Sequence, residues 1–144
     1  MKKLLFIQAL LVLCFILSVF IMYKHYESEN SKTTTNFMAK EIGTTFSQLK
    51  EGDHLISDYI HLSTNGFDED DVIELIKKTK KVKNTLKDLS GSSASIESLN
   101  EVLNALSTGN TKKASTLIET DFKDKLTVLK EVQISRLSDE AVER

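Results

Sequence analysis

Residues 39–62 read AKEIGTTFSQLKEGDHLISDYIHL, and their apolar side chains recur with the period of a helix. Two positions of a seven-residue repeat are mostly apolar: Ile42, Leu49 and Ile56 at one, and Ala39, Phe46 and Ile60 at its companion. Such a repeat places one apolar stripe along a helix, which is buried against other helices. We therefore expect a long helix here, in which Asp53 is the polar exception.

Three further apolar stripes follow, separated by short polar turns at 63–66, 90–93 and 107–110. Apolar spacings of three and four residues predict helices over about 33–62, 68–89, 94–107 and 111–138. Ser98 with Glu101 fits a capping box, and the alternative is that Ser98 lies inside the first turns of the helix. Thr111 is a candidate cap of the last helix. Short turns favour antiparallel neighbours, so the sequence predicts an all-α fold, an antiparallel up-down four-helix bundle.

The stretch from Leu4 to Tyr23 holds 20 residues without a charge. At about 1.5 Å per residue, a helix of this length spans the roughly 30 Å hydrocarbon core of a bilayer. We expect a short N-terminus (1–3), a transmembrane helix (4–23) and a helical domain (24–144). The transmembrane helix should continue into the bundle, with an irregularity near 28–36 where Thr33, Thr34 and Thr35 lower helix propensity.

Two alternatives to an uncleaved anchor stay open. Lys2 and Lys3 would suit a cleaved signal peptide, but the apolar run exceeds the usual ~7–15 residues and no small-residue cleavage site follows. Cys14 would suit a lipoprotein signal, but Leu13 stands before it, where those signals have a small residue. The uncleaved anchor is therefore the preferred interpretation.

The lysines around this stretch indicate its orientation. Lys2 and Lys3 precede it and only Lys24 follows at once, which favours a cytoplasmic N-terminus. The leading Met-Lys-Lys is typical of bacterial proteins. We expect a single-pass protein of the bacterial inner membrane, with its C-terminal domain periplasmic or otherwise extracytoplasmic.

Composition argues against several classes of function. Residues 24–144 carry 17 basic and 21 acidic groups, a net charge of −4, which gives no general affinity for nucleic acid. The one cysteine lies in the apolar stretch, and the sequence holds no Gly-x-Ser-x-Gly motif and no glycine-rich phosphate loop. We expect no enzyme activity and no cofactor.

Four polar residues on the first bundle helix are weak metal-site candidates. Glu51, His54, Asp58 and His61 stand three, four and three residues apart, so they share one helix face. Glu-x-x-His is half of a helical di-metal motif, but no second Glu-x-x-His occurs on another helix. A solvated helix face is the preferred interpretation, and no metal is expected; a pH-sensing pair is the remaining alternative.

The second predicted helix begins with acidic residues 68–71 and continues into lysines. This order complements the helix dipole. If this helix returns toward the bilayer, its lysine-rich end approaches anionic lipid headgroups. The candidates for headgroup contact are Lys80, Lys81, Lys83 and Lys87.

Residues 106–118, LSTGNTKKASTLI, resemble the loop between the helices of a tetratricopeptide unit. In that family a Gly-Asn or Gly-Asp turn precedes a small alanine that lets two helices pack closely. The resemblance implies a tight hairpin in which Gly109 makes the turn and Ala114 the close contact. We expect Ala114→Leu to overpack this hairpin.

The stalked arrangement as a whole resembles two other classes. It is similar to the sensor modules of bacterial chemoreceptors, which implies a ligand-sensing bundle of a truncated receptor type, with a small-molecule ligand. It is also similar to the inner-membrane spanin of phage lysis, which implies a membrane-anchored rod. We prefer a third function, a membrane-anchored module that positions a protein partner or a second copy, with Ile42, Phe46 and Leu49 as candidate contacts.

Overall fold

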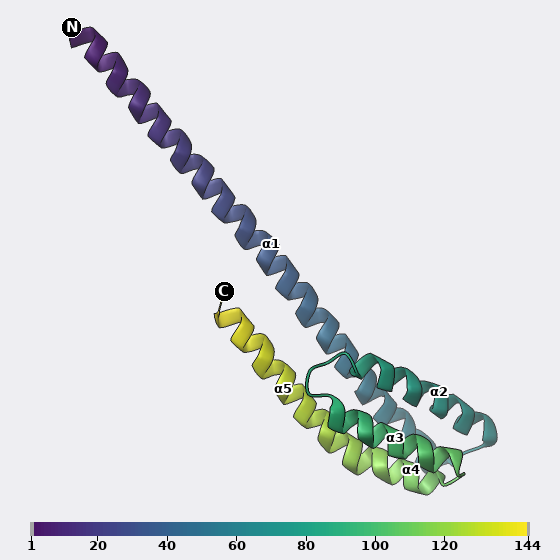
Figure 1. Cartoon of the computed structure of the whole chain (residues 1–144). Helices are drawn as coiled ribbons and strands as arrows, with labels where there is room; N and C mark the ends of the chain where they lie inside the picture. The colour runs from purple at the N-terminus through teal and green to yellow at the C-terminus, as the bar shows by residue number, and fades with distance from the viewer. Residues whose placement is uncertain (1, 144) are drawn as a thin grey trace. The chain divides into compact units, whose positions relative to one another are not determined.

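A computed structural model describes residues 2–143, with side chains from Val12 onward, and every regular element in this range is helical. The elements are α1 (Lys2–Asn65), α2 (Glu69–Leu86), α3 (Ser93–Ser107), α4 (Thr111–Leu117), the π-helical segment η1 (Ile118–Phe122) and α5 (Lys123–Val142). Since no turn separates α4, η1 and α5, they form one continuous fourth helix (Figure 1). The expected all-α class is confirmed.

The chain divides into two units, Met1–Glu41 and Ile42–Arg144, and α1 contributes to both. In the first unit α1 is unbroken at 28–36, so the expected irregularity is wrong. The hydroxyls of Thr33 and Thr35 donate to the carbonyl oxygens of Glu29 and Ser31, at 3.0 and 2.8 Å. Such bonds to the preceding turn let threonine side chains stay within a helix.

Apolar side chains dominate the described start of the first unit. Among the residues whose side chains are described, no helix carries an apolar stretch long enough to cross a membrane. The expected transmembrane helix begins at Leu4, and the side chains of its residues 4–11 are outside the described part of the structure. Its remaining residues, 12–23, are all exposed.

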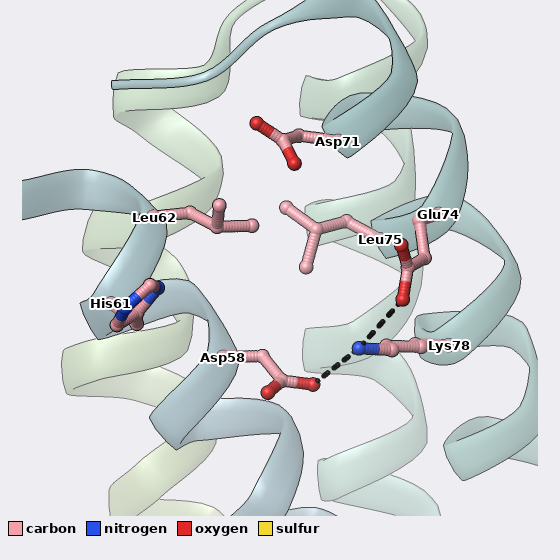
Figure 2. A pocket seen from close by; sticks show the side chains of 7 residues that line it. All are labelled: Asp58, His61, Leu62, Asp71, Glu74, Leu75 and Lys78. Atoms are coloured by element: carbon pink, nitrogen blue, oxygen red, sulfur yellow. Dashed lines mark hydrogen bonds and ion pairs between the residues drawn. The ribbon is translucent and has the colours of Figure 1, made fainter. Parts of the chain in front are cut away.

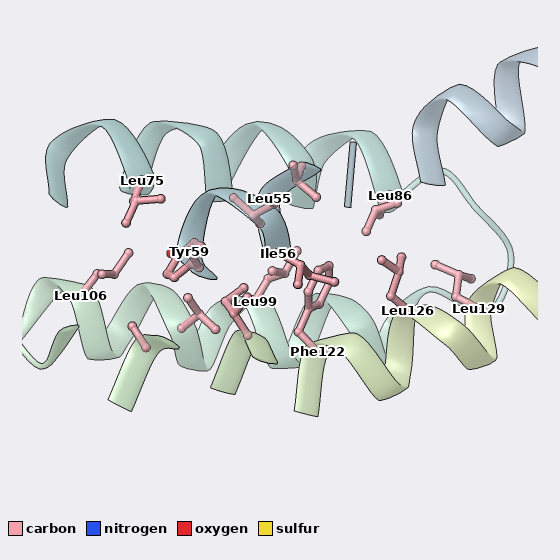
Figure 3. Close-up of a cluster of buried hydrophobic side chains, with 14 of the residues drawn as sticks. Leu55, Ile56, Tyr59, Leu75, Leu86, Leu99, Leu106, Phe122, Leu126 and Leu129 are labelled. Carbon is pink, nitrogen blue, oxygen red and sulfur yellow. The ribbon is translucent and has the colours of Figure 1, made fainter. Parts of the chain in front are cut away.

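The second unit is a bundle whose successive helices alternate in direction, as expected. Four contacting pairs fix the register: Asp58 with Lys78 and Glu51 with Lys81 between α1 and α2, and Ser63 with Glu119 and Asp53 with Lys130 between α1 and the fourth helix. Between α1 and α2, and again between α1 and the fourth helix, the residue number rises along one helix while it falls along the other. Both pairs of helices are therefore antiparallel. Figure 3 shows α3 in the same alternation, with Leu106 near Leu75 at one end of the core.

One apolar cluster, drawn from all the helices of the bundle, forms the core (Figure 3). Its largest members, Tyr59 and Phe122, are fully buried. Leucines from α1, α2, α3 and α5 surround them. Burial of one such aliphatic or aromatic side chain contributes about 1.5–3 kcal/mol, so this cluster is the main source of the bundle's stability.

The buried stripe of α1 differs from the expected stripe at its companion position. Leu49 and Ile56 are buried as expected, but the companion residues are Thr45, Gly52 and Tyr59, each one residue before an expected position. Ile60, assigned to the core by the sequence pattern, is exposed, and so is Phe46, which was expected to contact a partner. The prediction was wrong because Thr, Gly and Tyr were not counted as core residues.

Gly52 permits a close approach of α1 to α5. A Cβ atom at Gly52 would lie 2.8 Å from Cδ2 and 3.0 Å from Cδ1 of Leu126, well inside the ~3.5–4.0 Å of ordinary carbon contacts. Glycine in a helix interior costs about 1 kcal/mol relative to alanine. Close packing against Leu126 therefore explains a residue that helix propensity alone disfavours.

The π-helical segment η1 carries a polar contact between the third and fourth helices. Asp121 Oδ2 accepts a hydrogen bond from the buried hydroxyl of Ser98, at 2.6 Å, and another from Lys125 Nζ, at 2.9 Å. The Ser98 bond first, and then the Lys125 bond, lower the pKa of Asp121 below its ordinary value. Ser98 thus lies inside the early turns of α3, which is the second of its two expected placements, and it does not form a capping box with Glu101.

Candidate functional site

A polar groove runs along the outer junction of α1 and α2. It holds two adjoining pockets of about 120 and 240 Å³, which share Asp58 and Lys78. The first is lined by Asp58, His61, Leu62, Asp71, Glu74, Leu75 and Lys78 (Figure 2). The second is lined by Glu51, His54, Leu55, Asp58, Lys78, Lys81 and Val82. We call this feature the α1–α2 groove.

Ion pairs bridge the groove from side to side. Lys78 Nζ lies 2.9 Å from Glu74 Oε1 and 2.9 Å from Asp58 Oδ2, and Figure 2 shows the lysine between the two carboxylates. These bonds, to Glu74 first and Asp58 next, raise the pKa of Lys78. Lys81 Nζ lies 2.9 Å from Glu51 Oε2. Glu51, Asp58 and Glu74 are thus each held in an ion pair. The groove keeps a net negative charge, because its four carboxylates outnumber its two lysines.

All four metal-site candidates of α1 line this groove, but they do not form a ligand cluster. Asp58 and Glu51 contact the two lysines, His54 is exposed, and His61 Nε2 lies 3.2 Å from Asn65 Nδ2. Among the residues that the structure describes, no group of three or more His, Cys, Asp or Glu side chains is placed to hold a metal ion. The arrangement bridges α1 to α2 electrostatically.

The acidic run at 68–71 forms the start of α2. Asp68 Oδ1 accepts from the backbone N–H of Asp71 at 2.8 Å, and Asp71 Oδ2 accepts from the N–H of Asp68 at 3.1 Å. This reciprocal pair is a capping box. The run therefore has a structural role in the helix, in keeping with its expected match to the helix dipole.

The four lysine candidates for headgroup contact differ in their surroundings. Lys81 pairs with Glu51, and Lys83 Nζ donates to Asn100 Oδ1 at 3.2 Å. Lys80 and Lys87 are exposed and make neither an ion pair nor a side-chain hydrogen bond within the described residues.

The hairpin of α3 and α4 is tight, and Ala114 lies fully buried within it. Gly109 has φ +71°, a left-handed conformation that glycine adopts without strain. The N–H groups of Gly109 and Asn110 bond to the carbonyls of Leu106 and Ala105, which is a Schellman motif. Asn110 Oδ1 then accepts from Lys113 N–H, so Asn110 caps α4 and the predicted cap Thr111 is the next residue.

The junction of α1 and α5 presents an exposed apolar edge. The ion pair of Asp53 with Lys130, at 2.6 Å, marks this junction. On α1, side chains 7 or 11 residues from Asp53 lie on the same helix face as Asp53. On α5, the side chain 4 residues after Lys130 lies on the same face as Lys130. They are Ile42, Phe46, Ile60 and Ile134, which are 37, 50, 45 and 54% exposed. We call these four residues the α1–α5 edge.

One of the three expected partner contacts lies elsewhere. Leu49 is 2% exposed and belongs to the core, so it offers no surface to a partner. Ile42 and Phe46 are exposed and belong to the α1–α5 edge. Ile134, which sequence reasoning missed, lies one helical turn after Lys130, the residue of α5 that contacts Asp53 of α1.

Two interior polar features also escaped sequence analysis. The Tyr59 hydroxyl lies 2.9 Å from Thr79 Oγ1, which donates to the Leu75 carbonyl at 2.6 Å. Burial raises the pKa of Tyr59 to about 12. The Ser115 hydroxyl is buried and, within the described residues, has no hydrogen-bond partner. The helical spacing of apolar residues in the sequence predicts neither of these two polar features.

Comparison of the sequence and structure with protein-family models, with curated proteins and with solved structures finds no match.

Proposed function

We propose that this protein is a single-pass, membrane-anchored helical module that binds another protein at the membrane surface. The 20 uncharged residues 4–23 support the anchor. So does the exposure of residues 12–23, because a helix that is apolar on all its faces favours hydrocarbon over water. By the lysine distribution, the bundle lies outside the cytoplasm of a bacterium.

The observation that carries the binding proposal is the α1–α5 edge. Four large aliphatic or aromatic side chains are exposed along one junction, beside a core whose own residues are buried. Exposed apolar surface at a helix junction costs solvation free energy, which a protein partner recovers by covering it. The proposed mechanism is positional: the anchor holds the bundle at the bilayer, and the edge recruits a partner.

A second copy of the chain is the partner that we propose. Two copies anchored in one membrane from the same side present their α1 helices in parallel. Each then offers the same edge, as a two-fold interface requires. Ile42 and Phe46 stand four residues apart, a spacing that suits helix pairing.

The ligand-sensing alternative has less support. The pockets of the α1–α2 groove, at about 120 and 240 Å³, are smaller than the roughly 300–1,000 Å³ of typical ligand pockets. They are lined by side chains already paired with one another. Binding of a protein partner at the α1–α5 edge is therefore better supported than binding of a small molecule in the α1–α2 groove.

Disulfide crosslinking in membranes tests the proposal. Ile42→Cys in a Cys14→Ser background should form covalent dimers on mild oxidation. Gly43→Cys is the matched control, because a Cβ there meets no atom within 4 Å and the residue lies on another face of α1. Adding Phe46→Asp to Ile42→Cys should abolish the dimers. Equal crosslinking at 42 and 43, or none at 42, would rule out the second copy as the partner.

A further inference from the structure

The C-terminal half of α2 concentrates positive charge. Between Ile76 and Lys87 the sequence holds six lysines and no acidic residue: Lys77, Lys78, Lys80, Lys81, Lys83 and Lys87. The apolar positions between them, together with Thr79, are turned into the core. The lysines therefore occupy the remaining faces of this helix.

The structure divides these lysines into two groups. Lys78, Lys81 and Lys83 contact polar side chains of the bundle. Lys77, Lys80 and Lys87 are exposed and have no ion-pair partner in the part of the chain that the structure describes. They stand three and seven residues apart, so they share the outward face of α2. We call these three residues the lysine stripe.

We infer that the lysine stripe binds the phosphate groups of an anionic phospholipid surface. Lysine is a compact point charge on a flexible stem, which suits mobile headgroups, whereas arginine forks and stacked aromatics suit specific phosphates and bases. The stripe has neither. Ile73, four residues before Lys77 on the same face, is 46% exposed and supplies an apolar contact at the interface. The candidates for headgroup contact therefore differ from those expected from the sequence. Lys77 is added, and Lys81 and Lys83 are removed because they contact side chains of the bundle.

The expected strength follows from the number of charges. Each lysine near an anionic membrane surface increases binding about fivefold, so three increase it roughly a hundredfold. This inference rests on the proposed function in one respect: the anchor keeps the bundle close to the bilayer. The attraction must weaken with salt, since the Debye length falls from about 10 Å at 0.1 M to about 3 Å at 1 M.

Short-range fluorescence quenching in vesicles tests the inference on the full chain. A fluorophore is attached to a cysteine introduced by Asn84→Cys in a Cys14→Ser background. Position 84 lies between Lys80 and Lys87 on the same exposed face of α2. The vesicles contain a lipid with a nitroxide on its headgroup, and either phosphatidylcholine alone or about 30% phosphatidylglycerol as well. We expect quenching with phosphatidylglycerol that is lost in the triple variant Lys77→Gln, Lys80→Gln, Lys87→Gln. It should also be lost in about 1 M salt.

A charge-matched variant and a flotation assay separate the outcomes. Lys112→Gln, Lys113→Gln, Lys123→Gln removes three exposed lysines elsewhere and should keep the quenching. Equal loss in both triple variants, or equal quenching without phosphatidylglycerol, would overturn the inference. So would binding of an RNA oligonucleotide through the stripe without quenching by lipid.

Flotation reports on the anchor separately. A chain that floats with phosphatidylcholine vesicles but shows no quenching with phosphatidylglycerol contradicts the lysine stripe and leaves the anchor standing. A chain that floats only with phosphatidylglycerol vesicles, and no longer does so as the lysine-stripe triple variant, contradicts the anchor and supports the stripe.

Discussion

Replacement of Tyr59 by phenylalanine should change the stability of the bundle in opposite directions at neutral and at high pH. Tyr59 is fully buried, and Thr79 donates its own hydroxyl proton to the Leu75 carbonyl. The Tyr59 hydroxyl must therefore be the donor to Thr79 Oγ1, at 2.9 Å. Tyr59→Phe removes one neutral hydrogen bond, which should cost about 1 kcal/mol near pH 7.

Ionisation reverses this difference at high pH. The folded-state pKa of Tyr59 is about 12, against about 10 for an unfolded tyrosine. The raised pKa contributes stability that is fully present below pH 10 and is lost as the pH rises through 12. The loss amounts to about 1 kcal/mol near pH 11 and about 3 kcal/mol well above pH 12. Tyr59→Phe lacks this loss, so it should match the original protein near pH 11 and exceed it above.

Urea unfolding of the full chain in detergent micelles, followed by far-UV circular dichroism, measures the difference at each pH. Lysine titration affects both proteins alike and cancels in the comparison. Tyr26→Phe, at an exposed position of the first unit, is the control and should show no difference at either pH. A Tyr59→Phe difference that stayed constant from pH 7 to pH 12 would refute the burial of this hydroxyl.

Three further substitutions test the packing and capping of the bundle by the same unfolding assay. Ala114→Leu should lower the unfolding free energy by roughly 1–3 kcal/mol, since Ala114 is fully buried in the α3–α4 hairpin; an unchanged midpoint would mean that the site has room. Ser115→Ala should leave stability unchanged or raise it by up to about 1 kcal/mol, because its buried hydroxyl lacks a partner within the described residues; a clear loss would contradict this. Asp68→Ala should cost about 1 kcal/mol through loss of the capping box, whereas Glu69→Ala should cost much less; equal costs would argue against the cap.

Local chemistry made the helices of the bundle predictable from sequence. The sequence predicts turns at 63–66 and 107–110, the first of them after a helix end at 62, from residues whose turn preference acts within a few positions. The structure ends α1 at Asn65 and begins α4 just after Asn110. Such signals need no knowledge of distant contacts, which is why the number and order of the helices followed from the sequence.

Packing between helices was less accessible. The stripe of α1 was assigned one residue out of phase, because Gly52 is a core residue only where Leu126 approaches it, and Tyr59 only where Thr79 receives its hydroxyl. Both contacts join residues far apart in the sequence. An apolar pattern that counts Ile60 as a core residue and Gly52 as a weak point of the helix does not reveal these contacts.

The candidate surfaces show the same limit. Helical spacing placed Glu51 and Asp58 on one face, but it did not reveal that Lys81 and Lys78 would neutralise them from α2. Equally, six lysines on α2 looked alike in sequence, and only the neighbouring helices distinguish the paired ones from those of the lysine stripe.

The membrane anchor is the premise that the proposed function requires. Alkaline carbonate extraction of bacterial cells that express the full chain with a C-terminal tag tests it directly. The account predicts an uncleaved chain, of 16.2 kDa plus the tag, that stays in the membrane pellet after extraction. A chain shortened by its first 20 or so residues and recovered in the soluble fraction would contradict the anchor, because it would identify the apolar stretch as a cleaved signal.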